Sequence, residues 1–380
     1  MTGREQTGKV AIIGLGLMGG SLGLALKAAV PDLHISGYDR DGGAARKAQK
    51  MGAVDSAEGL AGPAVAGASI VVVATPILSV KEVLEEIAPH LAEGAVVTDT
   101  ASTKTAVMGW AEETLPEGVS FVGGHPMAGK ETAGIDRAEA GLFQGKAYCI
   151  CPSLRASPDA IRSVTGLARL VGAEPLYMDS PEHDQYAAAV SHMPLMVSTA
   201  LFSLVRTSPS WSDMGAMASS GFRDMTRLAS GDPVMAIGMW RSNRDAIIHW
   251  LERMMSEMGR YRDMLKDAQD EQLLRVFTEA QVQRDTFIAE PPRRLPEAPL
   301  EVDKGKAFLD MLVGGKMADN LRRAEKIPEM MREAPTEKGA DAGGKKRLSL
   351  ADRIAEDVKR DLEKLEKNRN KEDTAGEEGH

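Results

Sequence analysis

Short apolar runs alternate with amphipathic stretches over the first half of the chain. The runs typical of strands lie at residues 10–13, 70–74, 95–98, 121–123 and 147–151. Helical patterns such as those at 80–91 and 158–171 separate them. Strands that are apolar on both faces are typical of buried parallel sheets. Their alternation with helices predicts an α/β fold with a doubly wound, mostly parallel sheet.

From about residue 181 the pattern changes to long helical stretches rich in Met, Leu and Ala. These stretches cover residues 184–206, 214–229, 234–267 and 271–287. The second domain is therefore predicted to be all-α. Its methionines favour packing in a core or an interface, and a soft binding surface is the alternative.

The first strand-like run ends in a glycine-rich turn that opens a helix. Gly14 is placed for the tight turn, Gly16 for close approach of a pyrophosphate, and Gly19 for close packing of helix on strand. A helical pattern follows at residues 21–29, and its N-terminal amides would face the phosphates. Leu17 and Met18, between the glycines, are candidate cofactor contacts. The pattern predicts a dinucleotide-binding site of the Rossmann type. The alternative is a glycine-rich turn that binds nothing.

An acidic residue follows at the distance this motif requires. Asp39 lies roughly twenty residues past the last glycine, where a carboxylate binds the ribose 2′-hydroxyl and repels a 2′-phosphate. This favours NAD, while Arg40 keeps NADP open because a guanidinium pairs with a 2′-phosphate. Thr75 and Pro76 follow another strand directly, at the sheet edge where ligands of open α/β sheets bind.

These patterns divide the chain into four segments. We expect a dinucleotide-binding domain at 1–180, a helical substrate and dimerisation domain at 181–290, an extension at 291–333 and a tail at 334–380. The tail is dense in charges of both signs and in Gly, so it is predicted to be disordered and flexible or to form an isolated helix.

Composition narrows the possible partners. The net charge of −9 gives no electrostatic footprint for nucleic acid or an anionic membrane. The longest apolar runs are interrupted by Gly, Pro or charge short of a membrane span, and residues 1–9 carry no export signal. We therefore expect a cytoplasmic protein. Cys149 and Cys151 have no further ligands nearby, so buried reduced thiols are expected and no metal site.

Two loops predicted at one sheet edge carry candidate chemistry. His125 follows the strand at 121–123 on a glycine-bounded loop, where an imidazole could accept a hydroxyl proton near neutral pH. A histidine bonded to its own loop is the alternative. Ser102, in the segment 99–104, is either a helix N-cap or a hydroxyl that bridges His125 and substrate. Lys104 either supports that loop or neutralises Asp99.

The helical part adds an imidazole and two guanidiniums. His192 precedes Pro194 inside a helical pattern, where a kink could turn it toward a cleft. Arg223 and Arg227 are spaced i and i+4, on one predicted helix face. Such a pair suits a dicarboxylate, and a surface charge cluster is the alternative.

Taken in order, these motifs resemble the prephenate dehydrogenase family, which includes arogenate and cyclohexadienyl dehydrogenases. The resemblance covers residues 9–288 and rests on the segments 14–23, 99–104, 125–129, 191–194 and 221–233. It departs at Leu195, where the family usually has His after Ser-His-Leu-Pro, and at Lys130, where relatives often carry Thr.

The resemblance implies oxidative decarboxylation of prephenate to 4-hydroxyphenylpyruvate in tyrosine synthesis, with NAD as cofactor. It implies that His125 is catalytic and that Ser102 orients the ring hydroxyl. His192 would line the substrate cleft and Arg227 would bind a carboxylate, with Arg223 and Lys130 nearby. It also implies a homodimer formed through the helical domain.

Three other functions stay open from the sequence. Arogenate is the alternative substrate within the family, with tyrosine as the product. A β-hydroxyacid dehydrogenase also opens with this glycine motif, although no glycine-rich segment precedes a catalytic lysine in 187–229. A nucleotide-sensing protein would need no proton acceptor, so the combination of His125, Ser102 and Arg227 argues against it.

Overall fold

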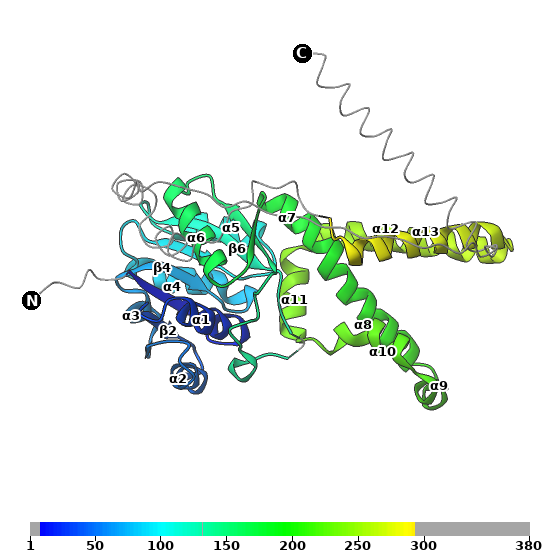
Figure 1. The fold of residues 1–380 in the computed structure, drawn as a ribbon, viewed down its shortest axis with the longest axis horizontal. Coiled ribbons are helices and arrows are strands. Elements are labelled where there is room, and N and C mark those ends of the chain that lie inside the picture. Colours follow the sequence, from blue (N-terminus) through cyan, green and yellow to red (C-terminus); the bar gives the residue numbers. More distant parts are fainter. Residues whose placement is uncertain (1–7, 131, 293–380) are drawn as a thin grey trace, which may run out of the picture. The chain divides into compact units, whose positions relative to one another are not determined.

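The structure, a computed structural model, describes residues 8–130 and 132–292 (Figure 1). These residues form two compact units, 8–251 and 252–292. Apart from residues 291 and 292, the predicted extension at 291–333 and the predicted tail at 334–380 lie outside the described residues.

An eight-stranded sheet forms the centre of the first unit, in the order β3-β2-β1-β4-β5-β6-β7-β8. Its strands are β1 (Lys9–Ile13), β2 (Ile35–Tyr38), β3 (Ser56–Ala57), β4 (Ala68–Val73), β5 (Val96–Asp99), β6 (Ser120–Pro126), β7 (Ala147–Pro152) and β8 (Glu174–Tyr177). All neighbours pair in parallel except β6 and β7. The predicted doubly wound, mostly parallel sheet is confirmed, and β1 and β4 flank the point where the strand order reverses.

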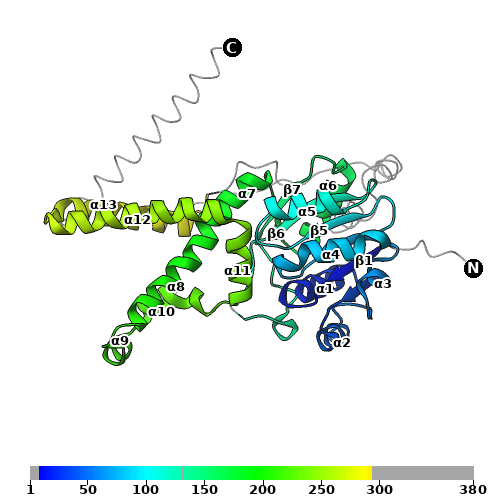
Figure 2. The ribbon, with the colours of Figure 1, turned by 180° about the vertical axis from the view of Figure 1, so that it is seen from behind.

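Helices cover both faces of this sheet. They are α1 (Leu17–Ala29), α2 (Gly42–Lys50), α3 (Ala61–Val65), α4 (Val80–Ile87), α5 (Thr105–Thr114) and α6 (Pro158–Leu170). Buried side chains of α1, α2 and α6 pack against one face, and those of α3, α4 and α5 against the other. Figures 1 and 2 show these helices from opposite sides of the molecule.

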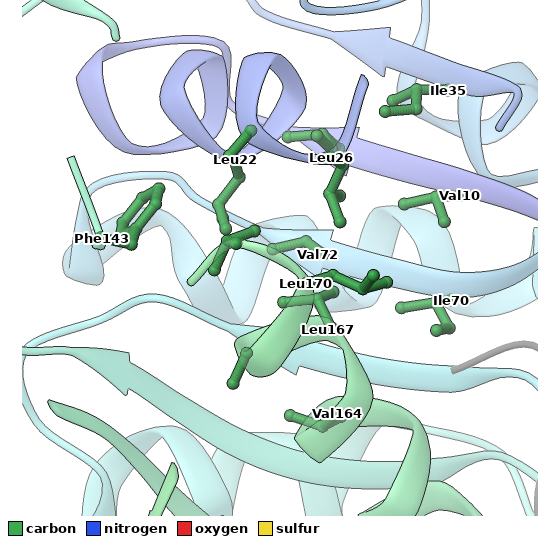
Figure 3. Close-up of a cluster of buried hydrophobic side chains, with 14 of the residues drawn as sticks. Val10, Leu22, Leu26, Ile35, Ile70, Val72, Phe143, Val164, Leu167 and Leu170 are labelled. Carbon is green, nitrogen blue, oxygen red and sulfur yellow. The ribbon is translucent and has the colours of Figure 1, made fainter. Parts of the chain in front are cut away.

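The strands contribute to both layers because alternate side chains point to opposite faces. In β4, Ile70 and Val72 belong to the layer under α1 and α6, while Val71 and Val73 belong to the other. Figure 3 shows the first layer, where Leu22 and Leu26 of α1 lie over the strand side chains with residues of α6. This double burial explains why the strands are apolar at consecutive positions.

Between residues 180 and 292 the described chain is helical, as predicted. The helices are α7 (Ser180–Ala187), α8 (Met193–Arg206), α9 (Trp211–Met217), α10 (Ser220–Thr226), α11 (Pro233–Ser242), α12 (Arg244–Lys266) and α13 (Asp270–Ala289). Three of the predicted helical stretches are divided. The stretch 184–206 is interrupted by a π-helical turn between α7 and α8. The stretch 214–229 breaks into α9, α10 and a 3₁₀ turn (Arg227–Ser230), and the stretch 234–267 breaks at Asn243.

A π-helical turn (Ala188–His192) joins α7 to α8. The sequence predicted a kink at Pro194, and the irregular turn stands directly before it, since proline cannot donate a backbone hydrogen bond to the preceding turn. Around this turn, Ala188 packs with Ala246 and Ile247 in a separate small core. The π-helical turn therefore sets the direction in which His192 projects.

One expectation about apolar length was wrong. The helical stretch Ser180–Arg206 contains an 18-residue window of mean hydropathy 1.6, so by length and composition alone it could cross a membrane. Within this stretch, however, His183, Asp184 and His192 are buried and hydrogen-bonded to other side chains. These contacts lie in the first half of the stretch, and only 17 % of the apolar window itself is buried.

The second unit consists of the end of α12 and of α13. Tyr261 and Phe277 stack at a ring-centroid distance of 6.3 Å and join the two helices. Several large apolar side chains of this unit are exposed, among them Met255, Met258 and Phe287.

Candidate active site

The glycine turn after β1 lies against the loop that follows β4. Gly14 has a φ of +94°, and a Cβ there would lie 2.6 Å from the carbonyl oxygen of Ala74. At Gly19 a Cβ would lie 1.9 Å from the carbonyl oxygen of Gly14, so only glycine lets α1 approach the turn. Around Gly16 nothing lies within 4 Å of a Cβ. This glycine therefore leaves open space that the protein itself does not fill.

Asp39 organises the same turn. Its carboxylate accepts hydrogen bonds from the backbone amides of Leu15, at 2.7 Å, and Asp41, at 2.8 Å. The sequence predicted only a ribose ligand at this position. Because each carboxylate oxygen has two lone pairs, Asp39 can hold the turn and still accept from a hydroxyl. Arg40 beside it is exposed.

These residues fit a dinucleotide. The first amides of α1, including those of Leu17 and Met18, have no acceptor within the helix, and no side chain caps them. The Thr75 hydroxyl is buried without a hydrogen-bond partner beside the glycine turn, and Pro76 is exposed next to it. Unsatisfied donors around open space suit the pyrophosphate and sugar of such a cofactor.

A buried ion pair joins the ends of β5 and β6. The Lys104 ammonium pairs with Asp99, and both side chains are fully buried. The ammonium also donates to the carbonyl of Gly124 at 2.7 Å, while Asp99 accepts from the amides of Gly124 and Ala101. Lys104 therefore both neutralises Asp99 and supports the loop, and the pair fixes the residue before His125.

His125 belongs to β6 and not to a loop. Because β5 pairs with β6 only as far as Val122, the end of β6 pairs only with β7, where His125 lies opposite Cys149. The strand extends further than the apolar run predicted, since two glycines and a histidine continue it. The ring is 7 % exposed, at the carboxyl end of the parallel strands.

A second histidine, His183 of α7, contacts His125. Nδ1 of His125 lies 2.8 Å from Nε2 of His183, and Nδ1 of His183 lies 2.8 Å from Oδ1 of Asp184. Asp184 in turn accepts from the amides of Lys104, at 2.7 Å, and Thr105, at 2.9 Å. Three side chains thus form a continuous buried hydrogen-bonded chain. The adjacent His-Asp pair in the sequence was the only signal of it.

Asp184 also replaces the cap that Ser102 was considered for. Helix α5 begins at Thr105, three residues past Ser102, and its first amides are bound by Asp184 from α7. The N-cap interpretation of Ser102 was therefore wrong. The Ser102 side chain is half-buried in the loop, and Nδ1 of His125 bonds to His183 rather than to Ser102.

Burial controls the charge of these groups. It opposes ionisation of Asp184, but hydrogen bonds from His183 and the two amides outweigh it and hold the pKa of Asp184 below its ordinary value. Burial, together with the neighbouring His183, Lys104 and His192, holds the pKa of His125 well below 6.5. Asp184 is therefore ionised and His125 neutral near pH 7.

His192 is oriented by an amide whose direction is fixed. Nδ2 of Asn243 donates to the backbone carbonyl of Asp184 at 2.7 Å and lies 3.3 Å from Nδ1 of His192. An amide nitrogen only donates, so Nδ1 of His192 accepts and the proton resides on Nε2. That Nε2 is buried and makes no hydrogen bond of good geometry, and the backbone of Ser102 lies close enough to the ring to act as an acceptor. Burial lowers the pKa of His192 to about 4, so the ring is a neutral donor.

The two arginines lie at the end of α10. Arg223 is in its last turn and Arg227 begins the 3₁₀ turn that follows, both exposed, so the predicted single helix face is interrupted. The amide of Ala229 donates to the hydroxyl of Ser198 in α8 at 3.2 Å. Ser198 lies six residues beyond His192, about 9 Å along a helix, so the Arg227 turn packs on the helix that follows His192.

Lys130 and the cysteines complete the predicted positions. The Lys130 ammonium pairs with Glu139 at 2.8 Å and donates to the carbonyl of Arg137. Cys149 and Cys151 are buried free thiols, as expected, and burial raises their pKa values to about 11 and about 12. Within 8–130 and 132–292, no three His, Cys, Asp or Glu side chains gather in an arrangement suited to a metal ion.

Comparisons with known proteins agree with this geometry. Residues 22–177 match the family model of the prephenate dehydrogenase nucleotide-binding domain, and residues 179–279 that of the prephenate dehydrogenase dimerization domain. The chain is 32 % identical to prephenate dehydrogenase of Bacillus subtilis over 73 % of its length and 75 % of the relative.

Two solved structures share the fold. Arogenate dehydrogenase of Synechocystis is 30 % identical, with a TM-score of 0.64 over 73 % of this chain and 99 % of that one. Prephenate dehydrogenase of A. aeolicus, solved with hydroxyphenyl propionate and NAD+, is 26 % identical, with a TM-score of 0.70 over 75 % and 100 %.

The glycine geometry makes a paired prediction. In Gly19→Ala the new methyl meets the Gly14 carbonyl, and we expect the free energy of unfolding to fall by about 3 kcal/mol. In Gly16→Ala the methyl enters open space, so stability stays within about 0.5 kcal/mol of the parent. The Kd for NAD should nevertheless rise about tenfold or more. Urea unfolding and fluorescence titration with NAD measure both; unchanged NAD affinity in Gly16→Ala would contradict the placement of the cofactor.

Acidification should weaken the fold through His192. Its folded pKa of about 4 lies below the unfolded value near 6.5, so its contribution is complete above pH 6.5 and is lost as the pH falls toward 4. The difference corresponds to about 3 kcal/mol. Urea unfolding at pH 7 and pH 4 should show that much more loss in the parent than in His192→Gln. Equal losses would show that His192 is not buried in the neutral form.

Proposed function

Because this chain belongs to the prephenate dehydrogenase family, we propose that it oxidatively decarboxylates prephenate to 4-hydroxyphenylpyruvate with NAD. The observation that carries the proposal is His125, buried and neutral at the carboxyl end of the parallel strands. A neutral imidazole is the group this reaction needs as its proton acceptor.

The chemistry assigns a role to each of the residues around the reacting ring. Bound NAD supplies the acceptor for the hydride that leaves the hydroxyl-bearing carbon. His125 takes the hydroxyl proton through Nε2, because its Nδ1 is occupied by His183. As the ketone forms, the bond from the ring to its carboxylate breaks and CO₂ leaves. The electrons of that bond pass through the ring to the ketone oxygen, which takes the proton back from His125, so that the ring becomes an aromatic phenol. Ser102, on the loop after β5, is proposed to orient the hydroxyl.

The substrate carries two carboxylates and a keto group, and the remaining polar residues suit them. His192 offers a buried neutral N–H beside the backbone of Ser102, which fits an uncharged or anionic oxygen acceptor. Arg227 is proposed to bind a carboxylate, with Arg223 beside it. Lys130 is proposed to act at the rim of the cleft, although Glu139 already neutralises it.

For the cofactor, we propose that Gly14, Gly16, Leu17, Met18 and Gly19 hold the pyrophosphate. Asp39 favours NAD because its carboxylate repels a 2′-phosphate, whereas the exposed Arg40 leaves weaker use of NADP open. Thr75 and Pro76 would border the cofactor on the β4 side.

Assembly and substrate choice are part of the same proposal. We propose a homodimer formed through residues 179–279, the part that matches the dimerization domain model. It would work in the cytoplasm, as expected for a biosynthetic enzyme. Arogenate is the second candidate substrate, favoured by the likeness to the Synechocystis arogenate dehydrogenase. Following NAD reduction with prephenate and with arogenate separately decides between them.

Removing the proton acceptor should abolish turnover without affecting the cofactor. We expect His125→Asn to lower kcat with prephenate by about a hundredfold or more and to leave the Kd for NAD unchanged. His249→Asn, at an exposed position on α12, is the matched control and should retain full activity. Normal turnover by His125→Asn would refute the role of this residue.

Removing the proposed carboxylate ligand should weaken substrate binding. Arg227→Ala is expected to raise KM for prephenate by about tenfold or more, with a smaller effect on kcat, because a bidentate guanidinium contact is lost. Arg206→Ala, an exposed arginine in the last turn of α8, serves as control. An unchanged KM in Arg227→Ala, measured at saturating NAD, would place the substrate elsewhere.

A further inference from the structure

We propose that His183 and Asp184 are positioning residues that hold His125 in the tautomer whose Nε2 accepts the substrate proton. The inference rests on the proposed function and extends it to two residues that need not touch substrate. It is carried by the two 2.8 Å contacts that link the three side chains.

The direction of the hydrogen bonds begins at the carboxylate. Asp184 is ionised and can only accept, and the backbone amides of Lys104 and Thr105 hold it from the start of α5. Nδ1 of His183, 2.8 Å from Oδ1, must therefore carry a proton. In the neutral form of His183, a proton on Nδ1 leaves Nε2 with a lone pair that can accept a hydrogen bond.

That lone pair determines the state of the next ring. Nε2 of His183 accepts from Nδ1 of His125, so the proton of neutral His125 resides on Nδ1 and its Nε2 is free to accept. If the chain ran in the other direction, Nε2 of His125 would be protonated and could not act as a base. The Asp184 carboxylate thus determines, through the His183 ring, which nitrogen of His125 is unprotonated and can accept the substrate proton.

The surrounding charges support this direction. The titratable groups that act on His125 are His183, Lys104 and His192, and the thiol of Cys149 lies opposite it on β7 with a raised pKa. The Lys104 ammonium is neutralised by Asp99, and His192 is a neutral donor, so neither supplies an acceptor for Nδ1 of His125. His183 is the acceptor that the structure places within hydrogen-bond distance of that nitrogen.

Because the three linked side chains are buried, the loss of one partner should change the tautomer of His125. All three residues are at least nine-tenths buried, with exposed fractions of 7 % for His125, 2 % for His183 and 4 % for Asp184. Water therefore has little access to replace a lost partner, and a change at His183 should alter the tautomer of His125 rather than be compensated by solvent.

The test is a pair of substitutions at one position. In His183→Gln the amide oxygen can still accept from Nδ1 of His125, so we expect kcat with prephenate to stay within about tenfold of the parent. In His183→Leu no acceptor remains, and kcat should fall by about a hundredfold or more, while the Kd for NAD is unchanged. Glu182→Gln, the neighbouring residue on α7, is the control and should behave like the parent.

Tautomers are measured directly and without substrate. Long-range ¹H–¹⁵N spectra of protein labelled at histidine, with the His125 signals assigned by their loss in His125→Asn, should show Nδ1 protonated in the parent and in His183→Gln. In His183→Leu the population should shift toward Nε2–H. Protonated Nε2 in the parent, or equal turnover by the two His183 variants, would overturn the inference.

These measurements separate the inference from the proposed function. If the parent turns over neither prephenate nor arogenate, the proposed function fails, and the spectra still test the hydrogen-bond direction. If the parent turns over prephenate but the tautomer is Nε2–H, only the positioning role fails. Should His183→Leu not fold, the parent and His183→Gln spectra decide the matter.

Discussion

The arrangement of the site depends on where one carboxylate is bound. Asp184 comes from α7, yet it accepts the first amides of α5 at Lys104 and Thr105 and the ring proton of His183. Its backbone carbonyl also accepts from Asn243. Through these contacts a single residue ties the start of the helical part to the sheet edge and orients both imidazoles that line the site. The two rings receive opposite roles, one as an acceptor and the other as a donor at Nε2.

The buried ion pair between Asp99 and Lys104 supports the same edge of the sheet, at a cost in desolvation free energy. Removing Asp99 and Lys104 from water is unfavourable, and such a pair is retained only if hydrogen bonds satisfy its remaining atoms. Here Gly124 contributes both its amide and its carbonyl to the pair. The backbone before His125 is therefore held from two directions. We interpret the pair as setting geometry rather than adding stability, because a buried ion pair gives little net stabilisation.

Much of the fold was predictable from local pattern. Consecutive apolar residues in β1 and β4 marked strands buried on both faces, and the glycine turn marked the point where strand order reverses. The functions of Gly14 and Gly19 followed from the motif, and the close backbone approaches bear them out. Helix ends were less predictable. The break at Asn243 depends on a side chain that bonds Asp184, and no local propensity specified it.

Some residues of the site were predictable from the sequence, and others were not. Sequence order identified His125 and His192 because each stands beside an unusual glycine or proline, but it overlooked His183, whose partner is 58 residues away. It also assigned Ser102 as a possible cap, whereas the cap of α5 comes from 80 residues further along the chain.

Short patterns of residues were enough to specify the doubly wound sheet, the cofactor turn and the candidate proton acceptor, because periodicity and glycine chemistry act over a few residues. The tautomers and the charge states of the histidines, in contrast, follow from the folded arrangement. These depend on burial and on hydrogen bonds between segments that are distant in the chain, and no short pattern of residues encodes them.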